Sequence, residues 1–221
     1  MRPINKGLAP KSYTSYNQAK DDLRNAIGSF CSYCEINISN QPDIEHVNPK
    51  SKNPDAENNW DNFLLACKTC NIMKSNNNDN RDGYIFPDTH NTAYAYKYKQ
   101  TKVEVNPEIS EEEKDLAVAT IELIKLNRQH DTNGREDDRI FARVREWDKA
   151  LESLADYKSC SNDEMARQIG RSPSGFHSSW LEVFSDYREV KQEILKNVNG
   201  TAMECYCDDL YPCNNLGRTS C

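Results

Sequence analysis

The chain has 221 residues, 37% of them hydrophobic, and a formal net charge of −7. This length suffices for one large domain or two small ones, and the hydrophobic fraction can supply a core. No run approaches the roughly 18 apolar residues of a membrane span, and the opening residues have no signal-peptide pattern. The composition therefore excludes an integral membrane protein and predicts a cytoplasmic one.

The charge is unevenly distributed along the chain. Residues 1–106 hold 13 Lys and Arg against 12 Asp and Glu, whereas residues 107–221 hold 15 against 23. Phosphate contacts normally require a basic face. The first part can meet a phosphate backbone and the second would repel it. This split indicates either a partner that supplies basic surface or an acidic face that is only solvated.

The first predicted elements are a polar arm and a helix. Residues 1–20 are expected to form an arm on the surface or on a partner. Helical character runs from Asn17 to Ile27 and ends near Gly28, which can adopt the left-handed conformation that stops a helix. The first cysteine pair, Cys31-x2-Cys34, follows directly.

A strand, a loop and a helix are predicted next. Residues 44–47 have strand character, which Asn48-Pro49 ends. Residues 60–66 are apolar and enter the second pair, Cys67-x2-Cys70, after which residues 71–75 begin a helix. Segments 84–87 and 94–105 are expected to give one or two edge strands before a boundary at 106–107.

Helices are predicted beyond this boundary. Ser110 to Glu113 reads as a capping box before an apolar stripe. Residues 136–157 and 175–198 are each expected to form one helix with a continuous buried face. For the first of these helices the predicted face comprises Ile140, Val144, Trp147, Leu151 and Leu154. Residues 162–172 are typical of a short helix and a turn in an all-helical domain, with DNA reading the lesser alternative.

The four paired cysteines indicate a metal. The chain has nine cysteines, and in a reducing cytoplasm two C-x-x-C units favour metal ligation over disulfides. Cys31, Cys34, Cys67 and Cys70 would close a tetrahedral structural zinc site. Thioredoxin-type redox chemistry and unpaired core thiols are the alternatives. The tail cysteines, which include Cys205, Cys207, Cys213 and Cys221, leave a second metal site open.

Acidic residues and a histidine lie between the two pairs. On a strand the carboxylates of Asp43 and Glu45 share one face, while His46 starts on the other and needs a twist or bend to join them. Carboxylates prefer hard ions such as Mg²⁺ or Mn²⁺, and a histidine can deprotonate water. Hydrolysis of a phosphodiester needs both.

The motif resembles the HNH endonuclease family, which has a ββα-metal fold. The resemblance rests on the cysteine pairs, on Asp43-x-Glu45-His46-x2-Pro49-Lys50 and on Asn62-x-Leu64 leading to Asn71-x2-Lys74. It implies that His46 is the general base and that Asn62 orders the loop that orients it. It also implies that Glu45 and Asn71 hold the ion, that Asp43 assists and that Lys74 contacts phosphate. Glu45 and Asn71 depart from the commoner aspartate and histidine but keep oxygen ligands, which favours Mg²⁺ or Mn²⁺ over Zn²⁺ there.

Residues 1–6 and 175–205 are similar to HNH proteins of bacterial Septu and retron-associated antiviral systems. That similarity implies an effector nuclease controlled by an ABC-type or OLD-like ATPase, and in retron systems a reverse transcriptase with its msDNA. The acidic helices would then be a docking module.

The predicted fold is α+β, a small zinc-clamped ββα-metal nuclease unit followed by a mainly α-helical domain. The expected divisions are an arm and helix at 1–30, the nuclease unit at 31–106, a helical docking domain at 107–200 and a cysteine-containing tail at 201–221. An inactive zinc-stabilised binding module is the alternative function. DNA is the favoured substrate, with tRNA or other RNA left open because the site acts on the phosphodiester.

Overall fold

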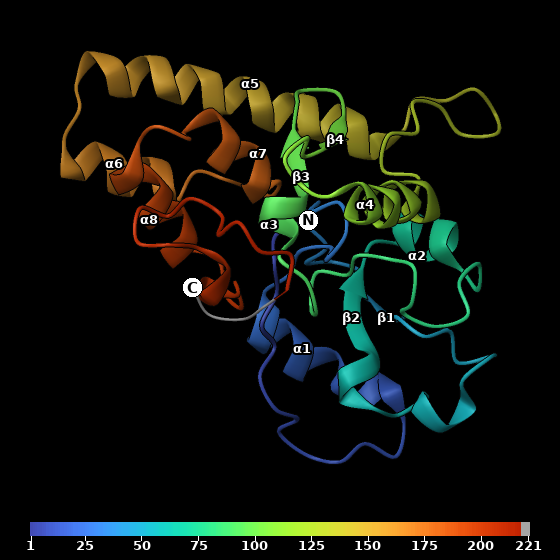
Figure 1. Ribbon diagram of the computed structural model, residues 1–221. Coiled ribbons are helices and arrows are strands. Elements are labelled where there is room, and N and C mark those ends of the chain that lie inside the picture. Colours follow the sequence, from blue (N-terminus) through green and yellow to red (C-terminus); the bar gives the residue numbers. More distant parts are fainter. Residues whose placement is uncertain (218–221) are drawn as a thin grey trace.

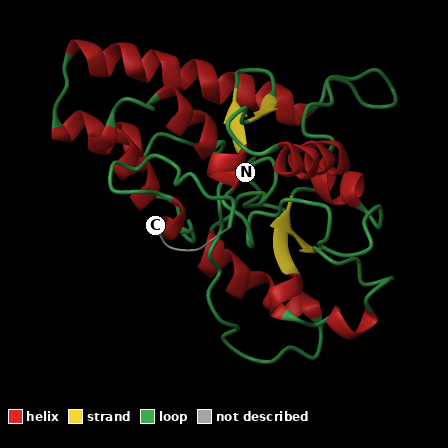
Figure 2. Ribbon diagram, in the orientation of Figure 1, coloured by secondary structure: helices red, strands yellow, loops and turns green. Residues whose placement is uncertain are grey.

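The computed structural model describes residues 1–217 and shows two short antiparallel hairpins surrounded by helices (Figures 1 and 2). The first hairpin pairs β1 (Asp43–His46) with β2 (Phe63–Ala66), and the second pairs β3 (Tyr96–Tyr98) with β4 (Val103–Val105). No helix within the described range is both long and apolar enough to cross a bilayer.

Residues 20–74, which we call the nuclease-like unit, form a hairpin with a helix on each side. After a short 3₁₀ turn, α1 (Lys20–Ile27) ends at Gly28, whose φ of 77° confirms the predicted stop. The strand register places Glu45 opposite Leu64 and His46 opposite Phe63. The helix α2 (Lys68–Lys74) follows β2 through Cys67, whose Sγ accepts from the Cys70 N–H and caps the helix. This cysteine cap explains why α2 begins three residues before the predicted start.

The helical part has one more helix than expected. It begins with α4 (Glu111–Ile124), whose Ser110–Glu113 capping box is present as predicted, and α5 (Asp138–Ser159), which runs along one side of the molecule (Figure 1). It continues with α6 (Asp163–Gly170), α7 (His177–Val183) and α8 (Arg188–Lys196). The single helix predicted over 175–198 is wrong, because the chain turns at Phe184–Tyr187 and α8 folds back to pack on α6.

Three further expectations are corrected. Residues 84–87 form no strand, and α3 (Thr92–Ala95) precedes β3 instead. The arm is not confined to the surface, because Met1 and Ile4 are buried and Ile4 pairs with Thr201. On α5, Leu151 is 45% exposed. The buried face of that helix is rotated toward Arg139, Arg143, Ala150 and Tyr157.

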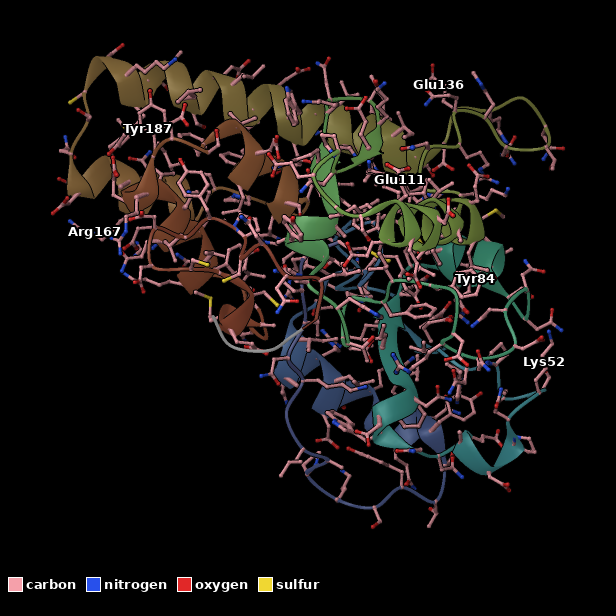
Figure 3. The ribbon with its side chains drawn as sticks, viewed as in Figure 1. Lys52, Tyr84, Glu111, Glu136, Arg167 and Tyr187 are labelled. Atoms are coloured by element: carbon pink, nitrogen blue, oxygen red, sulfur yellow. The ribbon has the colours of Figure 1, made fainter. Side chains whose placement is uncertain are left out.

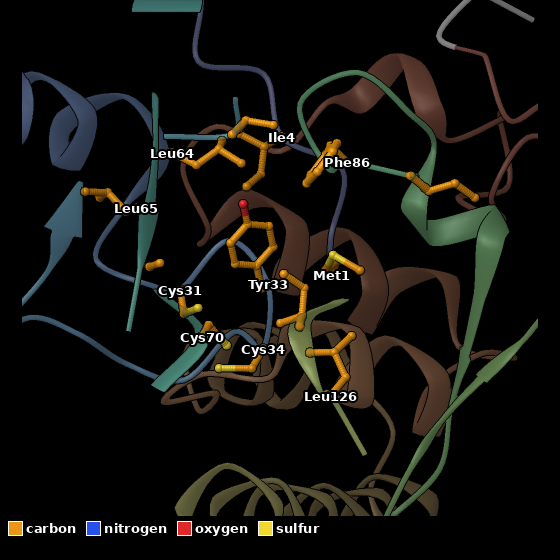
Figure 4. Close-up of a cluster of buried hydrophobic side chains, with 14 of the residues drawn as sticks. Met1, Ile4, Cys31, Tyr33, Cys34, Leu64, Leu65, Cys70, Phe86 and Leu126 are labelled. Atoms are coloured by element: carbon orange, nitrogen blue, oxygen red, sulfur yellow. The ribbon is translucent and has the colours of Figure 1, made fainter. Parts of the chain in front are cut away.

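Two hydrophobic clusters hold the molecule together. The larger one extends from Met1 to Leu126, also contains Leu216 and includes the four paired cysteines. Figure 4 shows three of these cysteines, Cys31, Cys34 and Cys70, near Tyr33 and Leu126. The smaller one joins α5, α6, α7 and α8 around Trp180 and Phe184. Because α4 belongs to the larger cluster, the division between the clusters does not coincide with the expected domain boundary at 106–107.

The tail is packed as far as residue 217. Asn91 donates to the carbonyls of Cys205 and Cys213, and both of these cysteines are buried. Cys221 lies outside the described residues. Within residues 1–217 the four paired cysteines are the only group of at least three His, Cys, Asp or Glu placed to hold a metal.

Candidate metal centre and active site

The cysteine cluster has the geometry of a zinc site. Its four Sγ atoms lie within 4.8 Å of one another, and Cys34 Sγ is 3.7 Å from Cys67 Sγ. Tetrahedral zinc with Zn–S bonds of about 2.3 Å separates sulfurs by about 3.8 Å. All four cysteines are buried, so the site is closed and leaves no position for a substrate. The residues therefore fit a structural zinc ion.

Two buried arginines of α5 stand beside these sulfurs, and sequence reasoning missed them. Arg139 Nη1 lies 3.2 Å from Cys70 Sγ and is held by Asp137, 2.9 Å from Nη2. Arg143 is 1% exposed, and its Nε and Nη1 have no hydrogen-bond partner within residues 1–217. Burial lowers the pKa of Arg143, and the negative charge of Cys34 opposes that shift.

Four thiolates with a bound Zn²⁺ would carry a net charge of −2, which two guanidinium groups would balance in a low-dielectric interior. The helical part is therefore tied to the nuclease-like unit by charge as well as by packing. The sequence carried no signal for this contact, because the pattern of an amphipathic helix places arginine toward solvent.

His46 is held in one tautomer. Its Nε2 lies 2.8 Å from the carbonyl oxygen of Glu57. A carbonyl only accepts, so Nε2 carries the proton and Nδ1 keeps a lone pair. No residue within 1–217 hydrogen-bonds Nδ1. Tyr16 and Phe63 contact the ring edge-on and fix its plane. Burial lowers the pKa of His46, and the nearby Lys50 adds to that effect, so the neutral base dominates at neutral pH.

Asn62 fixes the loop that holds this histidine. Its Oδ1 accepts from the Asn48 N–H at 2.7 Å, and its Nδ2 donates to the carbonyls of Asn48 and Ala56. Asn62 is 3% exposed, so these bonds are sheltered from water. Since Glu57 follows Ala56 directly, Asn62 sets the position of the carbonyl that orients His46. The role that the resemblance implies for Asn62, ordering the loop that orients His46, stays a prediction.

The carboxylates of β1 face α2, away from the His46 ring. Asn71 Nδ2 donates to Asp43 Oδ2 at 3.2 Å. Turning the Asn71 amide over would place its Oδ1 beside Asp43, and two such oxygens suit a hard divalent ion. Asp43 and Asn71 are both partly exposed. The structure thus brings together two of the three predicted oxygen ligands.

The third, Glu45, has another partner, and this changes two expectations. Glu45 Oε1 lies 2.7 Å from Lys74 Nζ, and Lys74 also donates to the His46 carbonyl at 2.9 Å. Lys74 is 0% exposed, so the expectation that it contacts phosphate is wrong. Glu45 is 2% exposed, and burial raises its pKa to about 7 despite the ion pair. Its carboxylate is engaged by Lys74, which does not support Glu45 as a principal ion ligand.

His46 and Asn71 both line one open hollow of about 300 Å³. We call it the catalytic hollow. Its lining includes His46, Lys50, Asn71, Ser75 and Asn76. Lys50 lies over the Tyr16 ring at 4.2 Å and pairs with Glu57 at 3.3 Å. A histidine, a side-chain amide and a lysine thus border one solvent-accessible space.

The other candidates take no part in this site. His90 Nδ1 accepts from the Phe86 N–H in a turn, outside the catalytic hollow. Tyr96 and Tyr98 are buried in the larger cluster, as the packing alternative predicted, and Tyr94 packs against it.

Comparisons with known proteins agree with the geometry. Residues 31–77 match the sequence model of the HNH endonuclease family. A stretch of 60 residues is 33% identical to the Septu protein PtuB of Bacillus thuringiensis, and it covers 26% of this chain and 23% of that protein. The chain therefore matches less than a quarter of that relative's length. The matched segment is an HNH unit similar to PtuB, and the rest of the chain is mainly helical.

Proposed function

We propose that this protein is a divalent-metal-dependent endonuclease that hydrolyses phosphodiester bonds of nucleic acid. The observation that carries the proposal is His46, which is locked with Nδ1 as an acceptor on a hollow that also holds Asn71. A base with a lowered pKa, fixed by a carbonyl and a buried asparagine, suits proton abstraction from water. The HNH match at residues 31–77 supports the same reaction.

Different residues have different roles in the proposed reaction. His46 Nδ1 takes the proton of the attacking water, and Asn62 keeps the imidazole in place through the loop to Glu57. Asp43 and Asn71 would hold a Mg²⁺ or Mn²⁺ ion, which when bound supplies positive charge to the transition state and the leaving oxygen. Lys74 holds the Glu45 carboxylate in an ion pair and donates to the His46 carbonyl, which stabilises the strand beside the hollow. Zinc at the cysteines has no part in this chemistry.

The test is cleavage by purified protein with Mg²⁺ or Mn²⁺. Duplex DNA, single-stranded DNA and tRNA are assayed with wild type and His46→Ala, each with and without the ATPase partner. We expect cutting by the wild type and a loss of about 10²–10⁴-fold in His46→Ala. DNA is the favoured substrate. Equal cutting by both proteins would exclude His46 as the base.

An inactive zinc-stabilised binding module is the second candidate. The Lys74–Glu45 ion pair favours it, because a lysine stands where the resemblance implies a metal ion. This candidate predicts bound zinc but no cleavage under any condition, with or without the partner. The same assay therefore separates the two functions.

We further propose that the protein is the effector of a bacterial antiphage system and docks on an ABC-type or OLD-like ATPase. The similarity to a Septu protein supports this proposal, as does the acidic character of residues 107–221. On α5, Phe141 is 56% exposed and Leu151 is 45% exposed, which offers apolar contacts to a partner. Co-purification of the ATPase should fall with Phe141→Ser/Leu151→Ser and persist with the exposed control Glu152→Gln. In retron-associated systems the reverse transcriptase and its msDNA would join the same complex.

A further inference from the structure

A second hollow, of about 430 Å³, opens on the far side of Asp43. We call it the basic hollow. Its lining includes Lys20, Arg24, Asn40, Gln41, Asp43 and Lys68. Three cations therefore surround one carboxylate, in a chain whose net charge is −7. None of these cations belongs to the machinery assigned above.

The cations come from two helices and are largely unpaired. Lys20 and Arg24 lie one turn apart on α1, and Lys68 is the first residue of α2. Within residues 1–217 neither Lys20 nor Lys68 makes an ion pair or a side-chain hydrogen bond. Arg24 is 4.0 Å from Asp21, and long bonds to Ser29 and Ser39 steady its guanidinium. Their charge is available to a ligand.

The two hollows adjoin. Asp43 lines the basic hollow, Asn71 lines the catalytic hollow, and the two side chains are hydrogen-bonded at 3.2 Å. Lys68 and Asn71 lie three residues apart on α2, and Ser75 directly follows the end of that helix. Ile72, between them, is 56% exposed. A linear ligand lying along α2 would touch both hollows.

We propose that the basic hollow binds the phosphate backbone of a nucleic acid to one side of the bond that is cut in the catalytic hollow. The inference rests on the proposed function for the place of the cut, but binding itself is measured separately. A polyanion fits because the cations outnumber the carboxylates and because the hollow continues into one with a general base. Lysine and arginine contacts of this kind position the strand without reading bases.

The contact predicts a salt dependence. Each phosphate that a cation neutralises adds about 0.9 to the slope of log affinity against log salt for duplex DNA, and about 0.7 for single strands. Removing three cations should therefore reduce the magnitude of this negative slope by about 2–3. Binding of duplex DNA, single-stranded DNA and RNA should all weaken, since the three share the phosphodiester backbone.

The experiment measures fluorescence anisotropy of labelled 20-mers over a range of salt, without added Mg²⁺, in a His46→Ala background. The variant is Lys20→Gln/Arg24→Gln/Lys68→Gln. The matched control removes the same charge elsewhere, as Lys99→Gln/Lys158→Gln/Arg167→Gln, all of which are exposed. Figure 3 shows Arg167 on the opposite side of the molecule from Lys52, which belongs to the nuclease-like unit. We expect the slope to fall in the first variant and to be unchanged in the control.

Folding is checked separately so that the result remains decisive. Zinc content should match the parent protein, and Lys68→Gln alone, at an exposed position, should lower the slope by about 1. The charge-preserving variant Lys20→Arg/Arg24→Lys/Lys68→Arg should restore binding. An unchanged slope in the triple variant would overturn the inference, and so would binding of an acidic peptide in place of nucleic acid.

The outcomes separate this inference from the proposed function. A reduced slope together with a wild-type protein that never cuts would reject the nuclease and retain the binding surface. Cleavage by the wild type together with an unchanged slope would retain the nuclease and reject the basic hollow.

Discussion

The cysteine cluster and the catalytic hollow share α2, but they are built in opposite ways. The cluster is closed: four buried sulfurs are backed by two buried arginines. The hollow is open, and both Asn71 in its lining and Asp43, which is hydrogen-bonded to Asn71, are partly exposed. Structural metal sites are saturated by protein ligands, whereas a catalytic site must leave a position for substrate. The first turn of α2 therefore contributes to the closed metal site, and its next turn borders the open hollow.

The largest effect should come from breaking the closed site. Cys70→Ser removes one thiolate and leaves Arg139 without its sulfur partner. Structural zinc contributes on the order of 10 kcal/mol to folding in small domains, so we expect loss of bound zinc and of cooperative unfolding. Metal analysis and thermal unfolding provide the measurement. A variant that folds normally without zinc would contradict a structural role for the cluster.

The next prediction distinguishes the structural role of Glu45 from the metal-binding role proposed for Asp43, although both lie on β1. Lys74→Met should destabilise the protein by about 3–5 kcal/mol, because the buried Glu45 carboxyl loses its ion-pair partner. Asp43→Asn should leave stability almost unchanged and abolish metal-dependent cleavage. Urea denaturation and cleavage assays measure the two effects. The control is Glu45→Gln/Lys74→Met, which should recover much of the stability that Lys74→Met loses.

A smaller change is expected when the support of the base is removed. Asn62→Ala frees the loop from Ala56 to Glu57 and lets the His46 ring turn. We expect cleavage to slow by about 10–100-fold with little change in substrate binding, since Asn62 lines neither the catalytic hollow nor the basic hollow. Steady-state kinetics should show the loss in kcat and not in KM. A variant with wild-type kcat would show that other contacts position His46.

The smallest effect concerns pH. Burial holds the pKa of His46 below its usual 6.5. Because a general base acts in its deprotonated form, the enzyme should lose activity only when the pH falls below that lowered pKa. The acid limb of the kcat/KM profile should therefore have its midpoint below pH 6.5. Replacing the nearby cation by Lys50→Gln should raise that midpoint, because Lys50 contributes to the lowered pKa. A midpoint above 6.5 would contradict this assignment.

The sequence predicted the local elements of the site better than the contacts between distant parts. The strand near Ile44, the stop at Gly28 and the Ser110 capping box follow from short-range chemistry and are present. Cysteine spacing indicated the cluster because C-x2-C turns direct two sulfurs to one point.

Long-range partners were not visible in the sequence. Lys74 was expected to reach phosphate, yet it turns inward because Glu45 is on the strand face that α2 covers. Arg139 lies 69 residues from Cys70 along the chain, and the pattern of an amphipathic helix gives arginine a place in solvent. The break at Phe184 depends on how α8 packs on α6, where Gly170 lets the two helices come close.

We propose a division of roles in which the cysteine cluster stabilises the fold and His46, in the catalytic hollow, acts in the reaction. It is tested most directly by measuring zinc content and nucleic-acid cleavage on the same preparations of wild type and His46→Ala, before and after addition of Mg²⁺ or Mn²⁺. We predict about one zinc per chain in both proteins, and cutting only by wild type with added ion. Cutting by His46→Ala at the wild-type rate, or by wild type with zinc alone, would contradict the account.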